Sequence, residues 1–136
     1  MDKRISVRGI IIEDDYIYAF FRRKNGREYY AFPGGGVEEG EIPEETVVRE
    51  LKEEFSVDIE VIKYLDTKEE ESTIVNFFLC KIINGIPKLG GEELLKHSED
   101  NYYEIRKVRI SEIDNIDIYH KDLIKRAILE TKKLDS

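Results

Sequence analysis

Cysteine, tryptophan and proline are scarce in this sequence of 136 residues, which contains one cysteine, no tryptophan and three prolines. The single cysteine, Cys80, excludes a disulfide within the chain and is compatible with a reducing cytoplasm. No apolar run approaches the roughly 20 residues of a membrane helix, because Asn76 and Lys81 interrupt the best candidate, Ile74 to Ile83. The first residues lead into a strand-like segment without an apolar signal-peptide core. We therefore expect a cytoplasmic protein without a membrane partner.

Positive charge is also in the minority, since 22 lysines and arginines face 30 acidic residues and give a net charge of −8. We do not expect duplex nucleic acid as a partner, because its binders present basic faces to phosphate. A small phosphate ligand remains compatible, since a divalent cation turns an acidic pocket into an anion site. The length and the hydrophobic share of 40% suit one core, so we expect a single domain from residue 1 to residue 136.

The apolar patterns along the chain predict strands interspersed with helices. Strands are predicted at Arg4–Glu13, Tyr16–Arg22, Glu28–Phe32, Val57–Leu65, Ser72–Ile83 and Tyr102–Ile110. Helices are predicted at Pro43–Phe55 and Asp122–Leu134. A hairpin turn is indicated at Asn25-Gly26, and loops are indicated at Pro33–Gly36 and Gly90–Asn101. This order favours a mixed sheet covered by helices, which is an α/β (α+β) architecture.

The helix predicted at Pro43–Phe55 separates its carboxylates from its apolar side chains. At about 100° per residue, one stripe is apolar and consists of Val47, Val48, Leu51 and Phe55. Glu50, Glu53 and Glu54 gather on another stripe, because residues three and four apart are neighbours on a helix. Hard divalent cations prefer carboxylate oxygen, and Mg²⁺ suits a few carboxylates together with substrate phosphates. A solvated acidic face is the alternative interpretation, since charge runs usually are solvated.

Three glycines, Gly34 to Gly36, precede this helix. Glycine allows the backbone to approach a ligand closely and to adopt a positive φ, although a plain tight turn is the more frequent reason for such a run. Taken together, the glycines and the helix resemble the signature of the Nudix hydrolase family, G-x5-E-x7-R-E-U-x-E-E-x-G-U, in which U is aliphatic. Every fixed position but one matches, in the order Gly35, Glu41, Arg49, Glu50, Leu51, Glu53, Glu54 and Val57.

The one departure is Ser56, which stands where the family has glycine. Glycine at this position is consistent with a left-handed end of the helix. Serine in that conformation costs roughly 1 kcal/mol more than glycine. The departure therefore affects the end of the helix and leaves the carboxylate stripe unchanged.

The resemblance implies a fold, an activity and a metal. Family members are typically α/β/α sandwiches with a central mixed β-sheet, and they use Mg²⁺ or Mn²⁺. They hydrolyse substrates in which a nucleoside diphosphate is linked to another group. We therefore expect a pyrophosphohydrolase that cleaves a phosphoanhydride bond in a nucleoside triphosphate or related nucleotide by attack of water at phosphorus.

Several alternatives to this activity remain open. Within the family, the substrate is alternatively a dinucleoside polyphosphate, an ADP-sugar or an oxidised nucleoside triphosphate. RNA 5′ ends are a further alternative, for which the charge of −8 is awkward. Outside catalysis, the alternative is a nucleotide-sensing module that has kept the fold. The sequence leaves monomer and homodimer open.

Carried over position by position, the resemblance implies metal ligation by Glu50, Glu53, Glu54 and the carbonyl of Gly35. One of these glutamates, or another beyond the signature, is expected to act as base on the attacking water. Beyond the signature, Glu93 is the candidate for a further metal ligand or for this base. Glu92 and Glu99 compete with Glu93 for this role. Arg49 is expected to orient Glu50, and Glu41 is expected to stabilise the junction between loop and helix.

Arginines and tyrosines supply the candidate contacts to a small nucleotide substrate. Arg22, Arg23 and Arg27 are candidates for charge-assisted hydrogen bonds to phosphate. Tyr30 is a candidate for contact with the base, within a larger set that is sufficient for a stacking wall: Tyr16, Tyr18, Tyr30, Tyr102 and Tyr103. Strand aromatics are more often part of a core, and the sequence does not choose among them.

Overall fold

The computed structural model describes residues 2–91, 97–98 and 100–134. In these ranges seven strands form one sheet: β1 (Arg4–Glu13), β2 (Tyr16–Lys24), β3 (Arg27–Ala31), β4 (Gly34–Gly36), β5 (Asp58–Glu69), β6 (Thr73–Asn84) and β7 (Asn101–Arg109). The helical elements are α1 (Pro43–Phe55), the 3₁₀ helix η1 (Ile110–Asn115) and α3 (Lys121–Leu134). None of the helices in these ranges combines the length and apolarity needed to cross a membrane.

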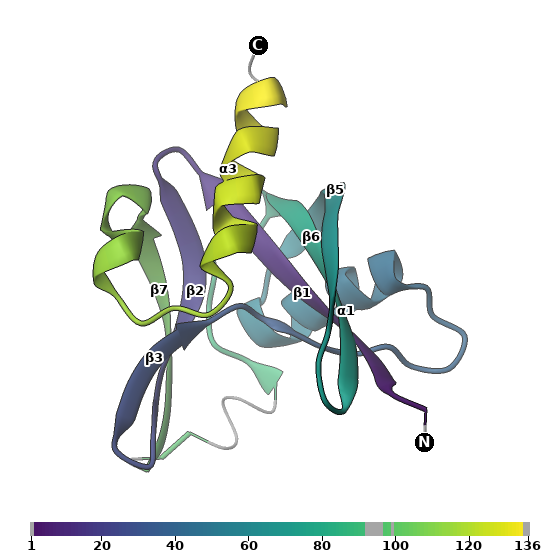
Figure 1. Cartoon of the computed structure of the whole chain (residues 1–136), viewed down its shortest axis with the longest axis horizontal. Coiled ribbons are helices and arrows are strands. Elements are labelled where there is room, and N and C mark those ends of the chain that lie inside the picture. The colour runs from purple at the N-terminus through teal and green to yellow at the C-terminus, as the bar shows by residue number, and fades with distance from the viewer. Residues whose placement is uncertain (1, 92–96, 99, 135–136) are drawn as a thin grey trace.

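Strand β1 is the centre of the sheet (Figure 1). One edge of β1 pairs in parallel with β6, which continues to β5. Its other edge is shared, because β4 pairs with Ser6 to Arg8 and β2 pairs with Ile11 to Glu13, both antiparallel. Strand β2 then carries β3 and β7. The mixed sheet that the sequence predicts is confirmed.

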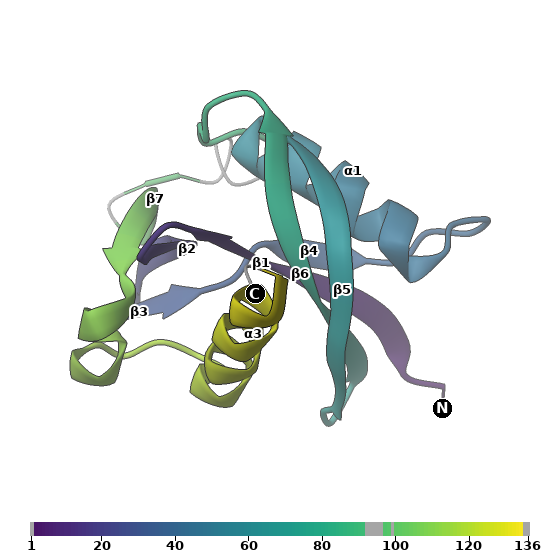
Figure 2. The ribbon, with the colours of Figure 1, turned by 90° about the horizontal axis from the view of Figure 1, so that it is seen from above.

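The two long helices cover opposite faces of this sheet (Figure 2). Helix α1 buries Val47, Leu51 and Phe55 in one core cluster, which also contains Cys80, and α3 contributes Leu123, Ile124 and Ala127 to the other. Burial of a large apolar side chain contributes about 1.5–3 kcal/mol. Close approach of α1 depends on Gly9 of β1, where an added Cβ would lie 3.1 Å from Leu51 and Val47. The helix that carries the acidic stripe is therefore fixed against the central strand.

The buried stripe of α1 differs from the prediction at Val48, which is 39% exposed. Thr46 is fully buried instead, and its hydroxyl donates to Glu41 Oε1 at 3.0 Å and to the Ile42 carbonyl at 3.1 Å. A hydrogen-bonded hydroxyl is tolerated in a core. The prediction used apolarity alone, so it included Val48 in the buried stripe and left out Thr46, whose hydroxyl is hydrogen-bonded.

The predicted loop at Pro33–Gly36 is wrong over its glycines, because Gly34 to Gly36 form β4. Positive φ angles occur at other described glycines and not in this run. The glycines are required by close packing, since an added Cβ on Gly34 would lie 1.9 Å from the Val7 carbonyl oxygen. On Gly35 it would lie 2.4 Å from the Glu50 carboxylate. Three residues without side chains thus let a strand fit between β1 and α1.

Helix α1 ends at Ser56 in the left-handed conformation, with φ 59° and ψ 32°. The Ser56 N–H donates to the Lys52 carbonyl, and its hydroxyl donates to the Lys88 carbonyl at 3.0 Å. In return, the Lys88 N–H donates to the Phe55 carbonyl at 2.8 Å. The serine side chain therefore makes a hydrogen bond that glycine cannot make, which offsets its backbone strain.

This offset predicts different effects for two substitutions at Ser56. Ser56→Ala keeps the strain and loses the hydrogen bond, so it should lower the free energy of unfolding by about 1 kcal/mol. Ser56→Gly also relieves about 1 kcal/mol of strain, so its stability should stay close to that of the wild type. Urea unfolding of the three proteins measures this, and an equal loss in both variants would contradict the offset.

Candidate functional site

The guanidinium of Arg49 lies at the centre of a hydrogen-bond network on α1. Its Nε and Nη2 donate to the two carboxylate oxygens of Glu41 at 2.6 and 3.0 Å, and Nη2 also donates to the Gly36 carbonyl at 3.2 Å. Its Nη1 donates to Glu50 Oε1 at 3.0 Å and to Glu53 Oε2 at 3.3 Å. One side chain thus connects β4, the turn before α1 and two carboxylates of the acidic stripe.

The same network perturbs the protonation of its members. The hydrogen bonds from Arg49, and then that from the Glu38 N–H, lower the pKa of Glu41 from 4.5 to about 2. The carboxylate of Glu41 in turn raises the pKa of Arg49 above its ordinary value. Both groups are therefore charged at neutral pH. Glu41 is fully engaged in holding Arg49 and the turn, which agrees with a structural role.

The three predicted metal-binding glutamates line one cavity of about 310 Å³, together with Gly34, Gly35 and Gly36. The side chain of Glu50 is 15% exposed and that of Glu53 is 52% exposed, whereas Glu54 is buried. Glu54 Oε1 accepts a hydrogen bond from the Gly34 N–H at 3.2 Å. Helical spacing brings the carboxylates together, and β4 supplies the opposite wall.

These carboxylates do not point at one common position. Within the described ranges, no group of three acidic, histidine or cysteine side chains converges closely enough to hold a metal ion. Their hydrogen bonds explain this arrangement. Arg49 donates to Glu50 and Glu53, whereas Glu54 accepts from the Gly34 N–H. Three carboxylates around one cavity nevertheless form the donor set that hard divalent cations prefer. The donor set fits such a cation, which would compete with the Arg49 hydrogen bonds.

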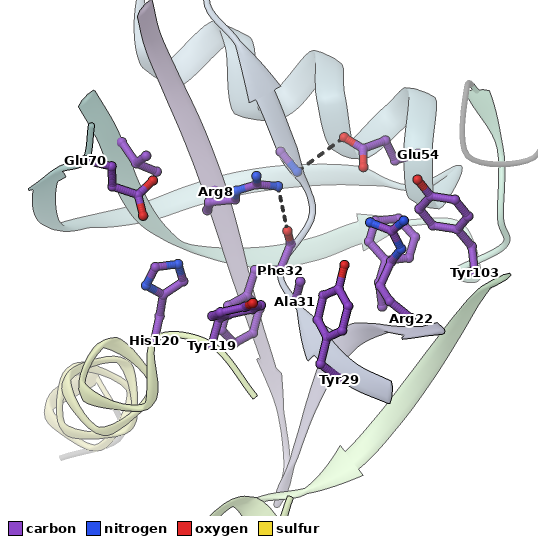
Figure 3. Close-up of a pocket in the computed structure, with 13 residues that line it drawn as sticks. Arg8, Arg22, Tyr29, Ala31, Phe32, Glu54, Glu70, Tyr103, Tyr119 and His120 are labelled. Carbon is purple, nitrogen blue, oxygen red and sulfur yellow. Dashed lines mark hydrogen bonds between the residues drawn. The ribbon is translucent and has the colours of Figure 1, made fainter. Parts of the chain in front are cut away.

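A second cavity, of about 540 Å³, is drawn in Figure 3. It adjoins the first cavity, because Gly34 and Glu54 line both. Its other charged and aromatic lining residues come from four strands, the link between β3 and β4, the β5–β6 turn and the segment before α3: Arg8, Phe20, Arg22, Tyr29, Phe32, Glu70, Tyr103, Tyr119 and His120. Aromatic walls with a few polar groups are typical of sites for small organic ligands. The structure therefore places an aromatic, arginine-lined cavity beside the acidic one.

Of the predicted substrate contacts, Arg22 lines this cavity. Its Nη2 donates to Asn101 Oδ1 at 2.7 Å, and its guanidinium lies 3.8 Å from the centre of the Tyr103 ring. Its Nε is buried and has no hydrogen-bond partner among the described residues. Burial of an unsatisfied donor costs about 1–3 kcal/mol, so the protein retains this arginine in the cavity wall at a cost in stability.

Tyr103, from the predicted aromatic set, also lines the cavity, whereas Arg23, Arg27 and Tyr30 do not. Arg23 is exposed and pairs with Glu28 at 3.0 Å, and Arg27 is exposed and pairs with Asp117 at 3.1 Å. The hydroxyl of Tyr30 accepts a hydrogen bond from Arg106 at 3.0 Å. Strand alternation explains the placement of Arg23 and Tyr30, because neighbouring residues face opposite sides of the sheet. Arg27 shares the face of Tyr29 but lies at the start of β3, where it pairs with Asp117.

The hairpin register identifies a lining residue that the sequence reasoning missed. Positive φ at Asn25 and Gly26, 53° and 78°, gives the predicted two-residue turn. This turn pairs Arg22 with Tyr29, so these two residues share a face. Counting outward from Asn25-Gly26 would therefore have selected Tyr29 over Tyr30.

Other missed lining residues carry no local signal. Glu70 lies on the turn between β5 and β6, and Tyr119 and His120 lie before α3, so the fold alone brings them together. His120 has a left-handed φ of 64°, an uncommon conformation for a residue with a side chain. Burial is the main cause that lowers the pKa of His120. The predicted base Glu93 and its competitors Glu92 and Glu99 lie outside the described residues.

Comparisons with known proteins agree with this geometry. A family model described as NUDIX domain matches residues 2–126. The chain is similar to an RNA pyrophosphohydrolase of Pseudoalteromonas translucida, with 40% identity over 57 residues, covering 40% of this chain and 33% of the relative. It is also similar to an ADP-ribose pyrophosphatase of Methanocaldococcus jannaschii, with 35% identity over 97 residues, covering 71% of this chain and 56% of the relative. The chain thus spans about a third and about half of the lengths of these two relatives.

A solved structure of a NUDIX hydrolase from Nitrosomonas europaea has the same fold, with a TM-score of 0.74 and 20% identity. The likeness covers 96% of this chain and 72% of that chain. The expected architecture of a mixed sheet with helices is confirmed.

The Arg49–Glu41 pair predicts a specific dependence of stability on pH. Because the pKa of Glu41 is lowered from 4.5 to about 2 by folding, its contribution is complete above pH 4.5 and is lost as the pH falls toward 2. Glu41→Gln should therefore be less stable than the wild type at pH 7, and this difference should shrink steadily below pH 4.5. Urea unfolding between pH 7 and pH 3 measures it, with the exposed Glu39→Gln as control. A difference that does not depend on pH would contradict the ion pair.

Proposed function

The chain belongs to the Nudix family, and from this membership and the two joined cavities we propose that it is a metal-dependent pyrophosphohydrolase. Its substrate would be a nucleoside diphosphate linked to another group, cleaved at a phosphoanhydride bond. The observation that carries the proposal is the junction at Gly34 and Glu54, which line both the acidic cavity and the aromatic cavity. A nucleotide that places its nucleoside in the aromatic cavity would present its phosphates to the carboxylates of α1.

Glu50, Glu53 and Glu54 would hold the cation, Mg²⁺ or Mn²⁺, with the Gly35 carbonyl as a further candidate ligand. When bound, such a metal lowers the pKa of the attacking water and neutralises charge on the phosphoryl oxygens. A carboxylate within hydrogen-bond reach of this water would accept its proton. The candidates for this base are the three glutamates of α1 and Glu93.

The remaining residues of the site would position these groups. Arg49 restrains the Glu50 side chain through a hydrogen bond of 3.0 Å, and Glu41 restrains Arg49 through two more. Arg22 would contact phosphate, because its guanidinium is already held by Asn101 and Tyr103 and loses little freedom on binding. The rings of Tyr29 and Tyr119, whose centres lie 5.4 Å apart, are candidates for contact with the base.

An ADP-sugar is the second candidate substrate, because the similarity to the ADP-ribose pyrophosphatase extends over 71% of this chain. Hydrolysis at RNA 5′ ends is supported by a shorter similarity, over 40% of the chain. A dinucleoside polyphosphate and a nucleotide-sensing role remain alternatives. The cytoplasmic location, the single domain and the monomeric or homodimeric state stay predictions from the sequence.

A product-resolved hydrolysis screen tests this proposal. The protein is incubated with Mg²⁺ or Mn²⁺ and with nucleoside triphosphates, ADP-ribose, nucleotide sugars, dinucleoside polyphosphates and 5′-triphosphorylated RNA. We expect turnover of at least one substrate, and we expect Glu53→Gln to reduce it by about a hundredfold or more. Glu44→Gln, an exposed change in the first turn of the same helix, should leave the rate unchanged.

Calorimetric titration with Mn²⁺ gives a second result that does not depend on finding the substrate. The wild type and Glu44→Gln should bind Mn²⁺ equally, and Glu53→Gln should bind it more weakly. Full activity or unchanged Mn²⁺ affinity in Glu53→Gln would show that α1 does not carry the metal.

A further inference from the structure

Two arginines of the aromatic cavity, Arg8 and Arg22, lack a carboxylate partner within the described part of the chain. The sequence offers more acidic residues than basic ones, 30 against 22. Five other arginines of the described part pair with acids, namely Arg23, Arg27, Arg49, Arg106 and Arg126. In the same described part, Arg4 and Arg109 do not, but neither of them lines this cavity. Two guanidinium groups without a carboxylate partner among the described residues therefore line the cavity that adjoins the acidic one.

Arg8 is held at the middle of this cavity by the backbone. It lies on β1 directly opposite Gly34, the glycine shared by both cavities. Its Nη1 donates to the Phe32 carbonyl at 2.9 Å, and the side chain is half-buried. This bond uses one N–H of the five that a guanidinium carries. The other N–H groups of Arg8 are therefore held in a fixed position beside Gly34, where the two cavities join.

Arg22 supplies the second guanidinium from β2. Asn101 and the ring of Tyr103 hold it in place, and its buried Nε has no partner among the described residues. In Figure 3, Glu70 lies at the end of the cavity near Arg8, and Glu54 lies at the end near Arg22 and Tyr103. A ligand bound between these two ends lies beside the guanidinium groups of Arg8 and Arg22, so this part of the cavity favours an anion.

We propose that Arg8 and Arg22 together form an anion site that binds the phosphate attached to the nucleoside, and that this site acts without the metal. The inference rests on the proposed function in taking a nucleotide as the ligand. Charge-assisted hydrogen bonds from two restrained guanidinium groups suit a phosphate with several acceptor oxygens. The site would hold the nucleotide at the junction, with its next phosphate directed toward the carboxylates of α1.

The test is calorimetric binding in EDTA, with AMP, GMP, inorganic pyrophosphate and adenosine as probes. We expect AMP or GMP to bind the wild type more tightly than adenosine. Arg8→Gln and Arg22→Gln should each weaken nucleotide binding by about tenfold and leave adenosine binding unchanged. Arg23→Gln, which changes the neighbouring exposed arginine, is the matched control and should bind like the wild type. Arg8→Lys should recover part of the lost affinity.

The ratio of nucleotide to nucleoside affinity separates a phosphate contact from a structural role. If the only role of Arg8 is its hydrogen bond to the Phe32 carbonyl, Arg8→Gln will lower the melting temperature without changing this ratio. That result would overturn the proposal. Equal binding of AMP and adenosine by the wild type, or no metal-free binding of any phosphate probe, would also overturn it. Hydrolysis is measured in parallel with Mg²⁺. Metal-free nucleotide binding without any hydrolysis would support the anion site and count against the proposed function instead.

Discussion

The hydrogen bonds of Arg49 are the constraint on which the acidic cavity depends. One guanidinium reaches Glu41, Glu50, Glu53 and the Gly36 carbonyl, so it links the turn before α1, two carboxylates of the helix and β4. The side chain of Arg49 is only 24% exposed, so water and salt screen its interactions less than they would screen those of a fully exposed arginine. Loss of the arginine would leave several partly buried carboxylates without a counter-charge, which is costly. Lysine would not replace it, because a single ammonium cannot present the planar fork that Glu41 accepts.

The position of β4 converts this constraint into a site. Because β4 consists of glycine, the strand lies against both the Val7 carbonyl and the Glu50 carboxylate without a side chain between them. Its first residue, Gly34, donates its N–H to Glu54 and pairs in register with Arg8. The acidic and aromatic cavities meet at this strand for that reason. Their meeting is a property of backbone packing, and the chemistry proposed for the protein is a consequence of it.

Local patterns in the sequence were sufficient for the parts of the site that lie within one element. Helical spacing places Glu50, Glu53 and Glu54 around one cavity, and Asn25-Gly26 forms the predicted turn. Ser56 ends α1 in the left-handed conformation that the family glycine suggests. These features depend on residues within a few positions of one another, which a single sequence displays.

Features that depend on distant segments were missed or misplaced. Gly34 to Gly36 look like a loop until β1 is present to pair with them. Val48 was predicted to be buried, but Thr46 is buried instead because Glu41 and the Ile42 carbonyl accept hydrogen bonds from its hydroxyl. The aromatic cavity combines β1, β2 and β3 with Glu70 and His120, and no local spacing connects these segments. The choice of Arg22 over Arg23 and of Tyr29 over Tyr30 as lining residues is an intermediate case. The sequence reasoning did not make this choice, although the register of the predicted hairpin would have allowed it.

The account's central claim is that the carboxylates of α1 hold a divalent cation at the junction of the two cavities. Its most direct test is an anomalous difference map, collected at the manganese edge, from crystals soaked in MnCl₂ with a non-hydrolysable nucleotide. The account predicts manganese peaks coordinated by oxygens of Glu50, Glu53 and Glu54, with Arg49 displaced from at least one of them. Manganese bound elsewhere, with Arg49 still donating to Glu50 and Glu53, would contradict it.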